Sequence, residues 1–207
     1  VRLHADGSLD ATFGDTSSGR WVATANHEGN IYDLLVASDG SITFTGVHLG
    51  STEDQMIGRL NASGAIDASF ATAGWYTISG PNDERSRAIA QRANGGFVVV
   101  GVDIPVTGTA LSESEGSVLC VGSTGAPDST CGSTGRMGFS IDGGDDQFWD
   151  VAVDDAGRFV VSGSASSAAS SFVSPLPFVI RLLPNLTIDS SFGSSGSTFF
   201  PFNIGHL

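Results

Sequence analysis

The strongest constraint on this chain is a tandem repeat with a period of roughly 60 residues. One motif places an Arg-Leu pair before a turn, and then an Asp and a Phe. It occurs three times in nearly full form and once in a degenerate form, over residues 2–14, 59–70, 181–193 and 120–132. One small sheet cannot cover both of its own apolar faces, so a repeat of this size predicts units that stack on one another.

A second motif lies between the copies of the first. It consists of two β-rich runs joined by a turn, and the second run ends in Gly; the copies are residues 32–46, 87–101 and 149–163. Turns such as Asp39-Gly40 and Asn94-Gly95 between apolar runs are the strongest short signal for a β-hairpin. Each copy therefore predicts two antiparallel strands.

Two further strands complete each unit. A short apolar strand follows the turn after each Phe, and another strand carries the Arg-Leu pair. No segment of ten or more residues has a convincing helical period. We therefore predict an all-β fold, a β-propeller-like array of four-stranded antiparallel blades. A single domain over residues 1–207 would hold about three and a half units, at 15–70, 71–131 and 132–192, with partial strands at both ends.

The repeated side chains suggest how these units hold together. Phe13, Phe70 and Phe192 occupy the same position of the first motif and are predicted to pack between blades. The Arg and Asp of the motif are eight residues apart across a turn, as in Arg2 and Asp10, and are expected to pair within a blade.

The degenerate copy replaces both the Arg and the Phe by cysteine, at Cys120 and Cys131. This paired substitution favours a disulfide, although two free buried thiols would also fit. A disulfide across so short a loop would stabilise the fold by roughly 2–3 kcal/mol. It would also indicate an oxidising compartment. No His or further Cys lies near in sequence, so a metal site is disfavoured.

The two motifs resemble the delta-60 repeat family of bacterial β-propeller-like repeats, which pairs an "RL-x-x-DG-x-LD-x-SFG" segment with an "AIA-x-x-x-DGK-hydrophobic-AG" segment. The resemblance covers nearly the whole chain and is weakest around Cys120, Pro127 and Cys131. It implies a large, often exported bacterial protein with no common catalytic activity. It carries no functional residues over to this chain.

Composition excludes several classes of function. The chain has 22 acidic and nine basic residues, a formal net charge of −13, and no basic stripe to hold a phosphate backbone, so nucleic acid is not an expected partner. A hydrophobic content of 40% is too high for a disordered chain. No apolar run approaches the ~18 residues of a membrane helix. Residue 1 shows no signal-peptide pattern, which suggests a processed product or a piece of a longer protein.

No catalytic constellation is visible. His4, His27, His48 and His206 are spread through expected loops or turns, where exposed polar residues are the usual interpretation. The chain lacks a nucleophile elbow between a strand and a helix. Its Gly-rich loops open no helices, which disfavours nucleotide binding. We therefore expect neither an enzyme nor a bound cofactor.

Two features leave a binding function open. The acidic stretch at residues 142–146, followed by Asp150, has carboxylates spaced closely enough to hold calcium, although the signal is weak and a solvated loop is the simpler explanation. Trp21, Trp75 and Trp149 would be either packing residues or platforms for sugars.

The functional expectation is a non-catalytic structural or protein-interaction module of an exported bacterial protein, located outside the cell, at its surface or in the periplasm. Exposed strand edges of an incomplete array favour other protein subunits as partners. The counter-interpretation is a compact monomer whose terminal segments cover those edges. The alternative function is a carbohydrate-binding propeller, assisted or not by calcium.

Overall fold

The structure, a computed structural model, describes residues 1–14, 18–22, 28–106, 113–132, 134–141, 143–167 and 175–200. These residues form twelve β-strands and contain no helix. Accordingly, no helix among them is long and apolar enough to cross a membrane.

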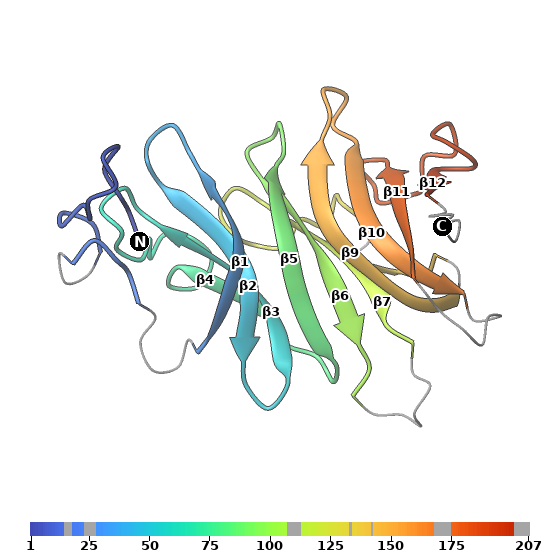
Figure 1. Cartoon of the computed structure of the whole chain (residues 1–207), viewed down its shortest axis with the longest axis horizontal. Coiled ribbons are helices and arrows are strands. Elements are labelled where there is room, and N and C mark those ends of the chain that lie inside the picture. Colours follow the sequence, from blue (N-terminus) through green and yellow to red (C-terminus); the bar gives the residue numbers. More distant parts are fainter. Residues whose placement is uncertain are drawn as a thin grey trace, which may run out of the picture.

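The strands form three antiparallel sheets of four strands, each in simple sequential order (Figure 1). The first sheet contains β1 (Gly29–Val36), β2 (Ile42–Leu49), β3 (Glu53–Leu60) and β4 (Trp75–Ile78). The second contains β5 (Asp83–Gln91), β6 (Phe97–Ile104), β7 (Glu115–Val121) and β8 (Arg136–Phe139). The third contains β9 (Gly143–Val153), β10 (Phe159–Ser167), β11 (Leu176–Leu182) and β12 (Ser197–Phe199).

This all-β arrangement is consistent with propeller-like blades. The grouping of the strands differs from the expected units, however. The short strands β4, β8 and β12 pair back onto the strand before them, as β4 does onto β3, instead of opening the next sheet. The tight turn after Phe70 explains this, because it reverses the chain directly beside β3. In the same way β12 pairs with β11 and completes the third sheet.

The partial strand expected at the N-terminus is not formed, because Leu3 makes only an isolated bridge to Leu9. Trp21 and Val22, after Phe13, also lie in no strand.

The apolar core lies between neighbouring sheets. Ile57 of β3 and Phe70 pack with Val99 and Leu119 of the second sheet. Val98 and Val118 of the second sheet pack with Phe148, Phe159 and Phe178 of the third, in a separate and larger cluster. Without the adjoining sheet, the side chains of either cluster would be exposed to water. The hydrophobic effect therefore holds each sheet against the next.

The closing Gly of the second motif has a geometric reason. Gly46, Gly101 and Gly163 each face a β-bulge in the first strand of their sheet. A Cβ atom on Gly101 would lie 1.8 Å from the carbonyl oxygen of Arg85, and one on Gly46 would lie 1.9 Å from that of Asn30. Only Gly allows the backbones to approach this closely. The sequence motif therefore encodes a bulge in every sheet.

Candidate functional site

The three bulges put one side chain per sheet at matched positions. The bulged residue is Tyr32 in β1, Arg87 in β5 and Trp149 in β9, each left unpaired in the strand register. A bulge bends its strand and re-aims the extra side chain, and bulges are common beside functional sites. Strands β1 and β9 both pack against β5, which lies between them in Figure 1.

The three side chains form one stack, which we call the bulge stack. The Arg87 guanidinium lies 5.4 Å from the centre of the Tyr32 ring and 4.8 Å from that of Trp149. Both distances fall within the range of cation–π attraction. Tyr32 and Trp149 remain 45% and 46% exposed, so the stack faces solvent on its aromatic sides.

The charge of Arg87 is unusual in this chain. Seven of the nine arginines form ion pairs. Arg87 forms none with the residues that the structure describes, and its Nε is buried without a hydrogen-bond partner there. A buried donor without a partner costs free energy unless a ligand or solvent satisfies it. The bulge stack therefore combines two aromatic surfaces with a cation that has no ion pair among the described residues, in a strongly acidic protein.

The repeated Arg-Asp-Phe motif has a different role. We call its four copies loop 1 (residues 2–14), loop 2 (59–71), loop 3 (120–132) and loop 4 (181–193). In loop 2, the Arg59 Nε donates to Asp67 at 2.7 Å, and the guanidinium lies 4.6 Å from the centre of the Phe70 ring. Loops 1 and 4 repeat both contacts, with Arg–Asp distances of 2.7 Å. The predicted pairing of Arg and Asp is therefore present in all three full copies.

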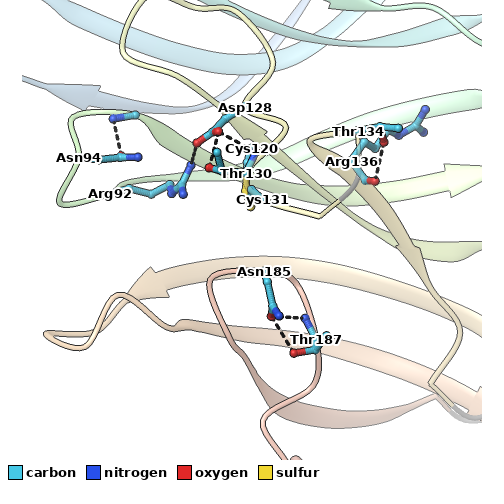
Figure 2. The surroundings of a disulfide bond; sticks show 11 residues. Arg92, Asn94, Cys120, Asp128, Thr130, Cys131, Thr134, Arg136, Asn185 and Thr187 are labelled. Atoms are coloured by element: carbon cyan, nitrogen blue, oxygen red, sulfur yellow. Dashed lines mark hydrogen bonds and ion pairs between the residues drawn. A yellow bond between two sulfur atoms is a disulfide. The ribbon is translucent and has the colours of Figure 1, made fainter.

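Loop 3 replaces this arrangement by a covalent one. Cys120 and Cys131 form a disulfide, with their Cα atoms 5.9 Å apart. Asp128 keeps its place in the motif but takes a new partner, because Arg92 of the preceding hairpin reaches it at 2.5 Å (Figure 2). The disulfide thus takes the place of the Arg–Phe contact. Arg92 takes the place of the motif arginine in the ion pair with Asp128.

Leu186 in loop 4 completes this exchange. It occupies the position of Gly64 in loop 2 and Gly125 in loop 3, with the same left-handed backbone (φ 66°), which is rare for a branched side chain. At Gly64 and Gly125, a Cβ atom would collide with the ring of the Phe of the preceding loop. At the junction of loops 3 and 4, Cys131 stands at the position of that Phe and leaves space beside the next loop. The Leu186 side chain occupies this position and is completely buried. The smaller side chain in one loop is compensated by the larger one in the next.

The aspartate of each loop also makes the stability of the fold depend on pH. A hydroxyl two residues after the Asp donates to it in every loop, as Ser69 does to Asp67 at 2.5 Å. This hydrogen bond, the neighbouring backbone N–H and the arginine lower the pKa of Asp67, Asp128 and Asp189 below 3.8, and that of Asp10 to about 2. Because the folded pKa values lie below the unfolded ones, the stabilisation is present above pH 3.8 and is lost as the pH falls through the folded values.

We therefore expect the melting temperature to fall steeply between pH 4 and pH 2, as followed by circular dichroism. Asp67→Asn removes the charge of one loop, and it should lower the melting temperature at pH 7 and converge with the unmodified protein at pH 2. The control is Asp155→Asn, since Asp155 is exposed and has no bonded partner in the described structure. A constant offset of Asp67→Asn across this range would contradict the assignment.

Glu84 is a buried acid that the sequence did not reveal. It is 1% exposed, and burial raises its pKa, although the Arg136 guanidinium lies 3.5 Å away. Asp146, at the matching position of the third sheet, is also fully buried and accepts the backbone N–H of Ile141. Neither acid opens to solvent, so both belong to the packing between sheets.

The acidic stretch does not form a calcium site in the described residues. Asp145 accepts hydrogen bonds from the backbone N–H and hydroxyl of Ser114, and Asp146 is engaged as above. Asp142 lies outside the described residues. Elsewhere in the described ranges, no group of three or more His, Cys, Asp or Glu residues is placed to hold a metal ion.

The two histidines that the structure describes, His4 and His48, are not brought together. His4 is exposed in loop 1, whereas His48 lies within β2 and not in a loop as expected; its ring is 3.7 Å from Asp54. His27 and His206 lie outside the described residues. Trp75 is buried in a third apolar cluster, with Phe13 and Phe44, and Trp21 packs against it. Of the three tryptophans, only Trp149 therefore belongs to the bulge stack.

A comparison with protein families adds one finding. The family model described as "Domain of unknown function (DUF5122) beta-propeller" matches residues 1–13, which lie in loop 1. The match supports a β-propeller-like repeat. A comparison with curated proteins gave no match. The matched segment is the first of the four copies of the Arg-Asp-Phe motif.

Proposed function

We propose that this chain is a non-catalytic structural or protein-interaction module of an exported bacterial protein, built from repeats of the delta-60 type. The observation that carries this proposal is that the recurring polar residues of the chain bond to one another. The Arg, Asp and hydroxyl groups that repeat from loop to loop are engaged with one another or with the next loop, as the hydrogen bonds of Arg59 show. Residues selected in every repeat for holding the array together indicate a scaffold.

The disulfide supports the exported location. Disulfides persist in oxidising compartments and are rare in the cytosol. The bond between Cys120 and Cys131 closes a loop that has lost its Arg–Phe contact, so oxidised cysteines would stabilise this loop.

Cross-linking in the producing bacterium tests this function. Envelope and culture-medium fractions would be treated with a carboxylate-reactive cross-linker, because the chain has many acids and no lysine. Mass spectrometry should find this chain in an exported fraction, linked to other polypeptides or to further copies of itself. Recovery in the cytosol, or links within single chains only, would contradict the proposal.

The bulge stack favours one alternative function, the binding of acidic carbohydrate. Aromatic faces pack against sugar rings, and an arginine without an ion pair is suited to a carboxylate. Tyr32 and Trp149 supply exposed aromatic surface on either side of Arg87. Asp145 and Asp146 of the acidic stretch are engaged in hydrogen bonds within the chain, so the case for this alternative rests on the bulge stack and not on calcium.

A glycan array carrying neutral and uronic- or sialic-acid glycans tests the alternative. It predicts a signal for acidic glycans that is lost in Trp149→Ala and in Arg87→Gln. Phe200→Ala is the matched control, since Phe200 is 48% exposed and lies outside the stack. Absence of signal for acidic glycans, or equal loss in the control, would exclude this function.

A further inference from the structure

Successive loops contact each other through one repeated set of bonds. From loop 1 to loop 2, Arg2 Nη1 donates to the Ala62 carbonyl at 2.6 Å, and the Gly14 N–H donates to the Ser63 carbonyl at 2.8 Å. The Phe13 ring packs on Gly64, where a Cβ atom would come within 2.8 Å of it.

From loop 2 to loop 3 the same positions are used. Arg59 Nη1 donates to the Ser123 carbonyl at 3.3 Å, and the Ala71 N–H donates to the Thr124 carbonyl at 2.6 Å. The Phe70 ring packs on Gly125. Each junction therefore joins a donor face, made of Arg, Phe and the residue after Phe, to an acceptor face, made of two carbonyls and a Gly.

Loop 4 carries the donor face in full. Arg181 is held by Asp189 and lies 4.8 Å from the centre of the Phe192 ring, as in the other loops. Phe192 is only half-buried, whereas Phe13 and Phe70 are 2% and 0% exposed. Phe192 is more exposed because no following loop among the described residues covers it, whereas the acceptor face of the next loop covers Phe13 and Phe70.

Loop 1 carries the acceptor face in full. Its carbonyls belong to Ala5 and Asp6, and its Gly is Gly7, all of them exposed. Gly7 has the same left-handed backbone as Gly64, with φ 84° in both. A Cβ atom on Gly7 would meet no atom within 4 Å, so the position that receives a Phe ring in loops 2 and 3 is open here.

We propose that two copies of this chain associate head to tail, with loop 4 of one copy on loop 1 of the other. Arg181 would donate to the Ala5 carbonyl, the Gly193 N–H to the Asp6 carbonyl, and Phe192 would pack on Gly7. The two faces are complementary, because a donor face and an acceptor face of this kind already contact each other at two junctions within the chain, from loop 1 to loop 2 and from loop 2 to loop 3. The inference rests on the proposed function, of which it names one partner.

The two faces belong to different copies and not to one folded-back chain. In Figure 1 loop 1 (dark blue) and loop 4 (red) lie toward opposite ends of the longest axis, with the three sheets between them. A donor face at one end and an acceptor face at the other is a heterologous arrangement, which forms a ring when the rotation closes. Two copies would bring together six four-stranded sheets, within the four to about eight blades of known propellers.

Sedimentation equilibrium of the purified chain tests the contact. The chain should be a concentration-dependent dimer. Phe192→Ala removes the donor ring, and Gly7→Leu fills the acceptor position with a residue that Leu186 shows the backbone can carry. Each should weaken association about 30-fold or more, as expected for a central contact. Gly157→Leu is the control, because Gly157 is also left-handed and open but lies in a hairpin turn.

Mixing the two variants gives a sharper result. Gly7→Leu keeps its donor face and Phe192→Ala keeps its acceptor face, so a mixture retains one intact junction and should form mixed dimers that neither variant forms alone. Circular dichroism confirms that both variants are folded. A monomer at the highest soluble concentration, or a dimer unaffected by both substitutions, would overturn the inference. Cross-links to other exported polypeptides would still support the proposed function in that case.

Discussion

Phe70→Ala is expected to lower the free energy of unfolding by about 3–5 kcal/mol, the usual cost of removing a fully buried aromatic ring. Phe70 is 0% exposed and lies between the first two sheets, with the Phe97 ring 6.3 Å away, centre to centre, and the Arg59 guanidinium over its face. Its removal leaves a cavity at the junction and also frees Arg59 from its aromatic contact. Urea unfolding measures the effect, at a protein concentration low enough to avoid association.

Phe192→Ala is the matched control, since it removes the same residue from the same position of loop 4. Phe192 is half-buried in the single chain. We expect a substantially smaller loss of stability than for Phe70. Equal losses in the two variants would mean that the ring stabilises its own loop and not the junction with the next sheet.

The second large effect is expected from restoring the repeat motif in loop 3. Cys120→Arg with Cys131→Phe removes the disulfide, worth about 2–3 kcal/mol for a loop this short. It also brings a ring into the space that Leu186 fills, which adds about 1–3 kcal/mol of overpacking. The double variant should therefore be destabilised by several kcal/mol, or fail to fold.

Adding Leu186→Gly to that double variant should recover much of the loss. The Gly then receives the new Phe ring, as Gly64 and Gly125 receive theirs, and the left-handed backbone no longer carries a branched side chain. Leu186→Gly alone, with the disulfide intact, should be destabilising, because Leu186 is completely buried. The opposite signs of the same substitution in the two backgrounds are the expected signature of coupling.

Urea unfolding of the four proteins under identical conditions gives the coupling directly. If Leu186→Gly were equally harmful in both backgrounds, then Leu186 would not be the counterpart of Cys131. The compensation between loops 3 and 4 would then be excluded.

The sequence was sufficient for the strands of the three sheets and for the loop chemistry, because both depend on local signals, but the partial strand expected at the N-terminus is not formed. Apolar runs around Asp39-Gly40 predict the β1–β2 hairpin, and the structure has it. The eight-residue spacing of Arg and Asp predicts an ion pair, which recurs at 2.7 Å. The paired cysteines of loop 3 are joined in a disulfide.

The assignment of strands to sheets was not available from the same signals. A short strand such as β4 could pair with the strand before it or with the one after it, and only the direction of the turn at Phe70 decides between them. His48 was expected in a loop, because Gly50 and Ser51 follow closely, but the ladder of β2 with β3 extends to Leu49. Glu84 looks like an ordinary surface acid, since its burial depends on neighbouring strands that are distant in sequence.

The bulge stack was visible in the alignment of the repeats without being recognisable as a site. Tyr32, Arg87 and Trp149 occupy the same position of the second motif. The closing Gly opposite each of them is the signal that could have identified a bulge there. Their mutual distances depend on how the sheets stack, which local sequence does not specify.

Stacking of the sheets on one another is tested most directly by nuclear Overhauser effects between aromatic rings and labelled methyl groups. We predict cross-peaks between the Phe70 ring and the methyl groups of Ile89, Val99 and Leu119, across the junction of the first two sheets. Cross-peaks from Phe70 to its own sheet alone, with none to the second, would contradict the account.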